Sequence, residues 1–267
     1  MRPVTAKPPL IVFSDLDGTL LGHDDYSWAS AAPALDRLRQ IGAGLVLASS
    51  KTAAEIAPLR AEIGFDDWPA IVENGCGLLP PGRAGSEGAE TYTRIRTLLR
   101  ALPKGFRGFG DMSVAQVAEA TGLPMEGAER ARARQYSEPG IWTGTEPALE
   151  AFLAAAAEVG LTARRGGRFL TLSLGGTKAD RMDEILNACG PCPSIALGDA
   201  PNDLEMLQRA DFGVIVRNDH SVPLPALPGE AEGRILRTRQ QGPQGWTEAI
   251  SQLLLDLKLI KDPIAHG

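Results

Sequence analysis

The sequence has no hydrophobic run long enough to cross a lipid bilayer, and basic residues are not in excess. Of its 267 residues, 43% are hydrophobic and 22% are charged, and the formal net charge is −6. A chain of this net charge is poorly suited to general nucleic-acid binding. The first nine residues, MRPVTAKPP, contain no apolar core of the kind found in signal peptides or membrane anchors. We therefore predict a cytoplasmic protein without a nucleic-acid or membrane partner.

Cysteine and histidine are also scarce, with three of each. Cys189 and Cys192 form the tetrapeptide CGPC, which is the active-site sequence of thioredoxins, so a thiol-redox role has to be considered. A redox cysteine is activated at the N-terminus of a helix, where the helix dipole favours the thiolate. Here the tetrapeptide follows a predicted helix over residues 178–188, and its Gly-Pro pair is typical of a helix stop. We therefore interpret both cysteines as structural, and the histidines show no zinc-site spacing.

The stretch LIVF at residues 10–13 predicts a strand buried on both faces, as in a parallel sheet. Asp15 and Asp17 follow it, and because side chains alternate along a strand, both point to the same side. Two carboxylates this close repel each other, and a hard divalent cation such as Mg²⁺ is their natural partner. The alternative is an acidic turn that only ends the strand.

Polar residues also follow three more predicted strands, and one basic residue begins a predicted helix. Lys178 lies in the first turn of a helix, where a cation is disfavoured unless an anionic ligand offsets the helix dipole, although it could also be a solvated surface lysine. Because the carboxyl ends of parallel strands meet at one edge of a sheet, we expect these residues to lie near Asp15. The others are Ser49, Ser50 and Lys51 after residues 45–48, Asn74 after 70–72, and Asp199, Asn202 and Asp203 after 195–197.

The chain length allows one or two domains, and the arrangement of the elements favours two. Proline and glycine cluster between residues 80 and 88, as in a domain linker. Residues 83–174 hold 12 basic and 10 acidic residues, a net charge of +2, which leaves −8 for the remainder. We predict an α/β protein with a doubly wound, parallel, Rossmann-like core (residues 1–82 and 175–267) and an inserted smaller α/β cap (83–174). A basic segment beside an acidic core suggests that the cap handles an anion.

Together these residues resemble the haloacid dehalogenase-like phosphohydrolases. DLDGT matches the family's DxD motif, Ser49 its hydroxyl motif, Lys178 its lysine motif and GDAPND its acidic motif, while the insertion corresponds to a C2-type cap. The blocks SSKTAAE, VENGCGLL, GFGDMS, RARARQYSEP, RGGRF and GDAPND are similar to those of mannosyl-3-phosphoglycerate phosphatases. Two departures lie in the cap: Gln135 replaces the usual Glu, and LTLSL is less polar than the family's segment. They bear on the substrate and not on the chemistry.

The resemblance implies a Mg²⁺-dependent phosphatase with Asp15 as the nucleophile that forms an aspartyl-phosphate. Asp17 would act as general acid and then general base, while Ser49 and Lys178 would contact the transferring phosphoryl group. Mg²⁺ would be held by Asp15, by the main-chain carbonyl of Asp17 and by Asp199, with Asp203 supporting that site. A phosphomutase shares the first half of this reaction.

The predicted substrate is a phosphorylated glycosyl-glycerate. Arginine's planar guanidinium suits a carboxylate, and Arg134 and Arg168 of the cap are candidates, with Arg168 beside the Gly166-Gly167 pair of a predicted hairpin. Both could instead be solvated. The resemblance implies hydrolysis of mannosyl- or glucosyl-3-phosphoglycerate to mannosylglycerate or glucosylglycerate, and a broader sugar-phosphate phosphatase is the alternative. We expect the remaining substrate contacts from Ser50, Lys51, Asn74 and Asn202. The sequence makes no prediction of oligomeric state.

A phospho-accepting signalling module also combines acidic residues, Mg²⁺, a hydroxyl group and a lysine. Such a module holds its phosphate, so it needs neither a general acid two residues after the acceptor nor a lid of about 90 residues. A protein that only binds sugar phosphates is a weaker alternative for the same reason. Asp17 and the cap therefore favour an enzyme.

Overall fold

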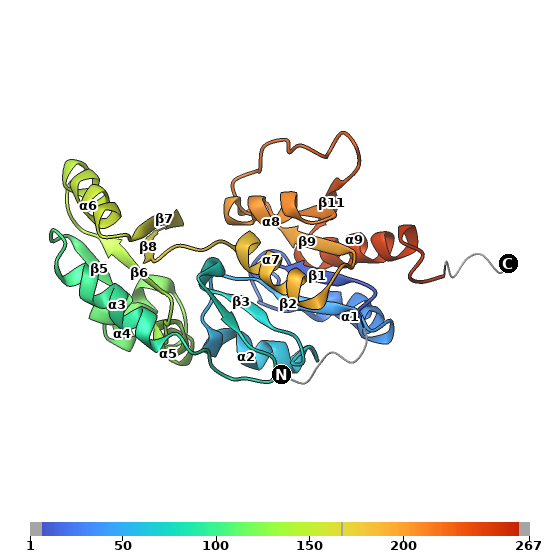
Figure 1. Ribbon diagram of the computed structural model, residues 1–267, viewed down its shortest axis with the longest axis horizontal. Coiled ribbons are helices and arrows are strands. Elements are labelled where there is room, and N and C mark those ends of the chain that lie inside the picture. Colours follow the sequence, from blue (N-terminus) through green and yellow to red (C-terminus); the bar gives the residue numbers. More distant parts are fainter. Residues whose placement is uncertain (1–6, 167, 262–267) are drawn as a thin grey trace.

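The computed structural model describes residues 7–166 and 168–261. Residues 1–6, on which the prediction about the N-terminal segment falls, and Gly167 of the predicted hairpin lie outside this range. Figure 1 shows two parts: an α/β core built from both ends of the chain, and a smaller part, coloured green to yellow, built from its middle. Within the described residues, no helix is long and apolar enough to cross a membrane.

The core holds a five-stranded sheet in which every neighbouring pair is parallel, in the order β11-β10-β9-β1-β2. This confirms the predicted parallel α/β core. All four residues of β1 are fully buried, as its unbroken apolar sequence predicted. The strands are β1 (Ile11–Ser14), β2 (Gly44–Leu47), β9 (Ser194–Gly198), β10 (Phe212–Arg217) and β11 (Ile235–Gln241).

Helices cover both faces of this sheet because successive strand residues point to opposite sides. Val12 faces a cluster that includes residues of α1 (Ala32–Gln40), α2 (Ala53–Glu62) and α9 (Gly242–Asp256). Phe13 faces a second cluster formed with α7 (Lys178–Cys189) and α8 (Leu204–Arg209). The helices cover the two faces of the sheet and not the carboxyl ends of its strands. The short 3-10 helices of the core are η1 (Ala29–Ala31), η2 (Glu73–Gly75) and η4 (Pro201–Asp203).

A short antiparallel pair of strands leads from the core to the inserted part. It consists of β3 (Ala70–Val72) and β4 (Gly77–Leu79), and a parallel bridge between Ala48 and Ile71 attaches it to the end of β2. The preceding helix, α2, begins with a capping box, in which Thr52 and Glu55 exchange hydrogen bonds. The C-terminal end of β3 is therefore held beside the end of β2.

The inserted part, which we call the cap, is built on a four-stranded antiparallel sheet in the order β5-β6-β8-β7. Leu170 and Leu172 face a cluster with α3 and α6, while Phe169 packs in a second cluster with α4 and α5. The proposed boundaries at residues 82/83 and 174/175 stay a prediction. The strands are β5 (Phe106–Gly108), β6 (Ser137–Trp142), β7 (Thr162–Gly166) and β8 (Phe169–Ser173); the helices are α3 (Ala89–Arg100), η3 (Phe109–Asp111), α4 (Val114–Thr121), α5 (Met125–Arg132) and α6 (Glu146–Glu158).

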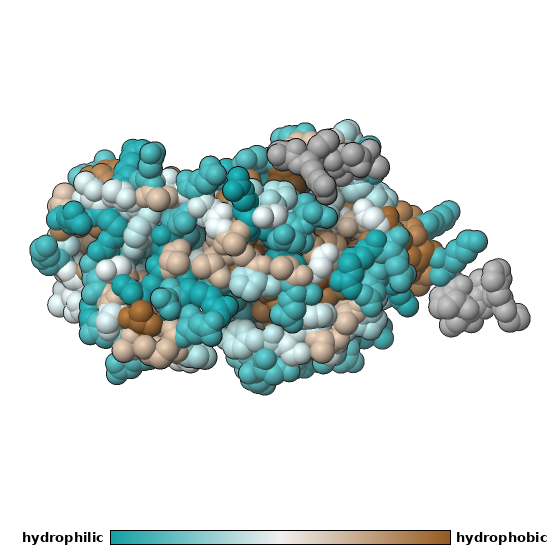
Figure 2. Space-filling view, turned by 90° about the horizontal axis from the view of Figure 1, so that it is seen from below, coloured by the Kyte–Doolittle hydropathy of each residue, from teal (hydrophilic) through white to brown (hydrophobic). Residues whose placement is uncertain are grey.

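Figure 2 shows hydrophilic residues over most of one face, with smaller hydrophobic areas between them. The large hydrophobic side chains that are exposed within the described residues belong to separate parts of the chain: Tyr26, Met125, Val159 and Val222. These side chains do not form one continuous hydrophobic patch in the sequence, and the polar groups at the carboxyl ends of the core strands are the stronger candidates for ligand binding.

The guanidinium of Arg60 holds the segment that connects the core to the cap. Its side chain is fully buried and donates to the main-chain carbonyls of Trp68, Leu79, Pro80 and Arg83. It also donates to the carboxylate of Asp66 at 3.2 Å. Loss of this side chain would leave several buried carbonyls without a donor.

We expect Arg60→Met to lower the free energy of unfolding by at least about 2 kcal/mol, because buried carbonyls lose their hydrogen bonds. The measurement is a urea titration followed by fluorescence and by circular dichroism. Arg209→Met is the matched control, since Arg209 forms an exposed ion pair with Asp183 and its loss should leave the midpoint unchanged. Equal midpoints for the two variants would contradict the role of Arg60.

Candidate functional site

The predicted site residues meet at the carboxyl edge of the core sheet. Asp15 follows β1, Ser49 follows β2 and Asp199 follows β9, and all three are buried. The ammonium of Lys178 lies 2.6 Å from Asp15 Oδ1 and 2.6 Å from Asp203 Oδ1. Segments from both ends of the chain therefore converge on one buried cation.

Lys178 is the first residue of α7, and Thr177 caps that helix through a capping box with Asp180. Its side chain is 1% exposed, so it is not a solvated surface lysine. Burial alone would lower the pKa of Lys178, but the attraction of Asp15 and Asp203 outweighs it, and the pKa lies above its ordinary value. The ammonium is therefore a permanent positive charge of the site.

Three buried carboxylates form a candidate cation site. Asp15, Asp199 and Asp203 each place one oxygen atom within 4.8 Å of the others. Burial raises the pKa of Asp15 well above its usual range; Lys178 acts against this, and the neighbouring carboxylates add to it. Burial likewise raises the pKa of Asp199. Carboxylates that are this costly to ionise together fit a hard divalent cation, which binds oxygen ligands and would favour their charged form.

Asp17 lies beside this trio with a separate partner. Its Oδ2 accepts a hydrogen bond from Lys51 Nζ at 2.6 Å, while its buried Oδ1 has no hydrogen-bond partner among the described residues. The hydroxyl oxygen of Ser49 accepts a hydrogen bond from the main-chain N–H of Lys51 at 3.2 Å. Burial would lower the pKa of Lys51, but Asp17 outweighs it and raises the pKa. Asp17 thus keeps one carboxylate oxygen without a partner.

The charges of the site leave room for a dication. The ionised carboxylates of Asp15, Asp17, Asp199 and Asp203 carry −4, and the ammonium groups of Lys51 and Lys178 carry +2, which leaves −2. A net charge of this size in a buried position is unfavourable unless a cation compensates it. One divalent ion would neutralise the site.

Two residues that the sequence analysis did not identify orient Asp199. Thr19 Oγ1 donates to Asp199 Oδ1 at 2.8 Å, and Asn218 Nδ2 donates to Asp199 Oδ2 at 2.8 Å. Asp203 Oδ2 accepts the main-chain N–H groups of Asp199 and Ala200 at 3.2 and 3.1 Å. Thr19 belongs to the DLDGT block, and Asn218 follows β10 at the same edge of the sheet, which is the signal that could have found it.

Asn74 and Asn202 meet at the exposed rim of the site. Asn202 Nδ2 donates to Asn74 Oδ1 at 3.1 Å. Asn74 has a φ of 58°, in the left-handed region that asparagine tolerates. A Cβ atom on the following Gly75 would lie 2.0 Å from the carbonyl carbon of Thr177, so only glycine lets this turn approach the start of α7.

Glu73 joins the core to the cap. Its carboxylate is 1% exposed and accepts hydrogen bonds from the N–H groups of Gln135 and Tyr136 and from the hydroxyl of Ser137. Arg134 forms a 3.4 Å ion pair with Glu73 and donates to the Ser50 carbonyl at 3.2 Å. Arg134 and Ser50 are therefore part of the core–cap junction.

The other predicted cap arginine lies elsewhere. Arg168 is exposed, immediately precedes β8 and donates to the carbonyl of Thr121 at 3.3 Å. The opposite end of β8, at Ser173, is the end that leads back to the core. Burial raises the pKa of the Cys76 thiol at that end, and the charges of Arg134 and Arg164 act against the increase. Arg164 is thus a basic residue near the junction that the sequence analysis did not identify.

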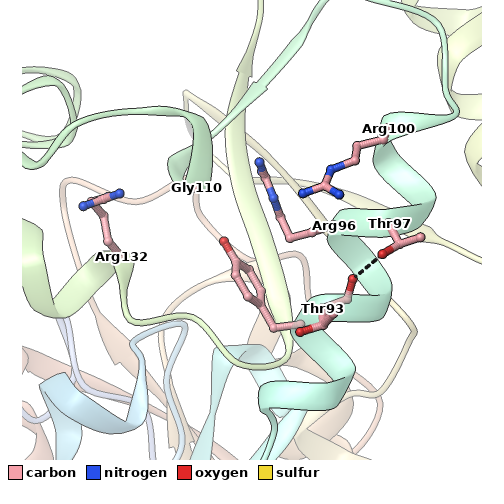
Figure 3. A pocket seen from close by; sticks show the side chains of 7 residues that line it. Thr93, Arg96, Thr97, Arg100, Gly110 and Arg132 are labelled. Atoms are coloured by element: carbon pink, nitrogen blue, oxygen red, sulfur yellow. Dashed lines mark hydrogen bonds between the residues drawn. The ribbon is translucent and has the colours of Figure 1, made fainter.

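The cap also contains a cavity of about 460 Å³ that is separate from the predicted site residues (Figure 3). Three arginines point toward it, Arg96 and Arg100 from α3 and Arg132 from α5. Beside it, the buried carboxylate of Glu138 accepts hydrogen bonds from the Tyr92 hydroxyl and from Arg96. Burial raises the pKa of Glu138 and, together with Glu138, that of Tyr92. Tyr92, Arg96 and Glu138 bind one another, so we assign this network to the stability of the cap.

The CGPC cysteines have the geometry expected of structural residues. Cys189 is the last residue of α7, where the helix dipole disfavours a thiolate, and Cys192 follows in a loop. Both are free thiols whose pKa is raised by burial. Both also pack against the cluster around Phe13. This is the opposite of the activated environment of a redox pair.

Comparison with known protein sequences identifies the family of the chain. The family model described as haloacid dehalogenase-like hydrolase matches residues 12–81 and 166–222. A glucosyl-3-phosphoglycerate/mannosyl-3-phosphoglycerate phosphatase from Persephonella marina is 32% identical, covering 93% of this chain and 98% of the relative. The chain therefore belongs to the haloacid dehalogenase-like hydrolases, as the sequence motifs predicted.

Solved structures show the same fold. A haloacid dehalogenase-like hydrolase from Bacteroides thetaiotaomicron has a TM-score of 0.65 at 21% identity, with 91% of this chain and 98% of that chain covered. The sucrose-phosphatase from Synechocystis, solved with sucrose and phosphate, has a TM-score of 0.59 at 16% identity, with 91% and 97% covered. At these identities the likeness establishes the arrangement of core and cap elements and nothing about the substrate.

We expect Mg²⁺ to raise the thermal unfolding midpoint, because the ion would bind only where Asp15, Asp199 and Asp203 are assembled. At 100 times its dissociation constant, a ligand of the folded state adds about 2.7 kcal/mol, or roughly 5–10 °C for a chain of this size. Asp199→Asn should lose most of this shift, and Asp183→Asn, on the surface of α7, should keep it. An undiminished shift in Asp199→Asn would exclude this trio as the cation site.

For the cysteines, we expect the double variant Cys189→Ser/Cys192→Ser to keep its full catalytic rate, since neither thiol lies at the carboxyl edge of the sheet. The measurement compares turnover with and without a reducing agent. Loss of turnover at an unchanged thermal midpoint would overturn the structural interpretation of CGPC.

Proposed function

We propose that the chain is a Mg²⁺-dependent phosphomonoesterase that hydrolyses mannosyl- or glucosyl-3-phosphoglycerate through an aspartyl-phosphate. The observation that carries the proposal is the buried Lys178 between Asp15 and Asp203, because its positive charge lies within 2.6 Å of the carboxylate that we propose as the nucleophile. Family membership and the near full-length similarity to the Persephonella marina phosphatase support it.

In the first step, an oxygen of Asp15 attacks the phosphorus atom, and the bond from phosphorus to the ester oxygen breaks. A phosphomonoester is anionic and resists an anionic nucleophile, so Lys178 has to neutralise charge on the phosphoryl oxygens. Asp17 takes up a proton when the substrate binds and gives it to the leaving oxygen, which becomes the hydroxyl group of the product. Its partner-free Oδ1 is available for this role.

In the second step, water attacks the aspartyl-phosphate. Asp17 accepts a proton from that water, and the bond from phosphorus to the Asp15 oxygen breaks, which releases phosphate and restores the carboxylate. Ser49 donates a hydrogen bond to the transferring group. Mg²⁺, held by Asp15, Asp199 and the main-chain carbonyl of Asp17 with Asp203 beside them, would supply further positive charge to the phosphoryl oxygens.

The proposed substrate carries a carboxylate beside its phosphate ester, so it needs a cation beyond those that hold the phosphate. Two cations lie near the carboxyl edge: Lys51, which donates to Asp17, and Arg134, which donates to the carbonyl of Ser50. Arg164 is a further candidate because its charge acts on Cys76 at the same junction. Arg168 lies before β8, at the end of that strand away from the core, so it is the weaker candidate among the cap arginines.

The test is a panel of phosphate-release assays with Mg²⁺ present. We expect kcat/KM for mannosyl- or glucosyl-3-phosphoglycerate to exceed that for 3-phosphoglycerate, mannose 6-phosphate and sucrose 6-phosphate, because only the first two combine a carboxylate with a glycosyl group. If a plain hexose phosphate is hydrolysed as well as the glycosylated compounds, the carboxylate argument is wrong and the enzyme is a general sugar phosphatase.

The same assay tests the residue roles. Asp15→Asn should abolish turnover, and Asp17→Asn should reduce it about 10²- to 10⁴-fold, the usual contribution of a general acid and base. Asp183→Asn is the control, because this side chain is partly exposed and paired with Arg209, and it should retain the full rate. More than trace activity in a correctly folded Asp15→Asn variant would exclude Asp15 as the nucleophile.

A further inference from the structure

Two histidines from distant parts of the sequence meet beside the carboxyl edge of the core sheet. His23 lies in the loop after β1 and His220 in the loop after β10, and they are the two histidines within the described residues. Their imidazole rings are stacked, with centroids 4.0 Å apart and planes inclined by 4°. With the carboxylate of Asp24, they place one potential ligand atom each within 4.8 Å of the others.

We propose that His23, Asp24 and His220 bind a divalent transition-metal ion such as Zn²⁺ or Ni²⁺ at a site separate from the acidic trio. Two imidazoles and one carboxylate favour zinc, nickel or copper, whereas Mg²⁺ prefers oxygen ligands alone. This site therefore differs from the one formed by Asp15, Asp199 and Asp203 in the type of metal that it prefers.

The side chains have to move before they can share one ion. Nitrogen and oxygen ligands lie about 2.1 Å from zinc, so two atoms that share an ion are at most about 4 Å apart. The three atoms are within 4.8 Å, and all three residues are exposed, so their side chains can close the difference. A metal lies in the plane of each imidazole that binds it, whereas stacked rings have parallel planes. Binding would therefore rotate at least one ring out of the stack.

The surrounding charge favours a cation. A cavity of about 480 Å³ beside the histidines is lined by Asp24, Asp25 and Arg217, among other residues. Arg217 is already paired with Asp219 at 2.8 Å, which leaves −2 from the two loop aspartates. Asp25 accepts a hydrogen bond from the N–H of Ser27, whereas the Asp24 side chain makes no hydrogen bond within the described part of the chain.

The location gives the site a connection to Asp199. The main-chain N–H of His220 donates to Asn218 Oδ1 at 3.0 Å, and Asn218 Nδ2 donates to Asp199 Oδ2. An ion bound to His220 would therefore order the segment that orients Asp199. The two sites share no ligand.

The first test is calorimetric titration with Ni²⁺ in excess Mg²⁺, which occupies oxygen-only sites. The background is Cys189→Ser/Cys192→Ser, so that thiols do not compete for nickel. We expect one Ni²⁺ per chain, affinity at least about tenfold weaker in His23→Gln and in His220→Gln, and none in the double variant. Asp25→Asn is the matched control: it removes a nearby charge but no ligand, so it should weaken binding less than either histidine substitution does. Unchanged affinity in the double histidine variant would overturn the proposal.

The second test locates the ion directly. Paramagnetic Ni²⁺ should broaden the ring-proton NMR signals of His23 and His220, each assigned by its absence from the corresponding glutamine variant. Mg²⁺ alone should leave both signals sharp. If neither signal broadens at a Ni²⁺ concentration that saturates the calorimetric binding, the ion lies elsewhere and the proposal is wrong.

Discussion

The contact of Lys178 with Asp15 and Asp203 is the interaction on which the rest of the site depends. A buried ammonium is stable only if carboxylates surround it, and buried carboxylates this close are stable only if cations separate them. Each group therefore requires the others, although they come from β1, from the start of α7 and from η4. The parallel sheet satisfies this requirement because it brings the carboxyl ends of β1 and β9 together. The residual charge of −2 then makes the edge a site for a divalent cation.

The sequence predicted this convergence because the relevant signals are local. An apolar run that ends in Asp15 or Asp199 indicates a buried strand with acids at its end, and parallel topology then brings those ends to one edge. The same reasoning missed β11, whose sequence ILRTRQQ alternates at an exposed sheet edge and is mostly polar. It also missed β5, which has only three residues. A strand that is stabilised mainly by pairing with its neighbour has only a weak hydrophobic pattern in its sequence.

Thr19, Asn218 and Glu73 could not be assigned from the sequence in the same way. Their roles depend on hydrogen bonds to residues far along the chain, and a threonine or asparagine near a turn is ordinary by itself. Strand register also decides which cap arginine approaches the core. Arg164 pairs in register with Thr171 in the middle of β8, whereas Arg168 precedes that strand at its far end. The guanidinium groups are chemically identical, so only the hairpin geometry distinguishes them.

The core–cap junction limits how the cap can move. Glu73 has a φ of 52°, an unfavourable backbone conformation for this residue type, and it is held there by its buried contacts. Its carboxylate accepts three hydrogen bonds from residues 135–137 of the cap and pairs with Arg134. Hydrogen bonds to a charged group contribute about 1.5–3 kcal/mol each, so separating cap from core at this point would cost several of them at once. Motion of the cap is therefore expected to pivot about Glu73, which keeps Arg134 and Ser50 together while the more distant strands of the cap approach or leave the carboxyl edge.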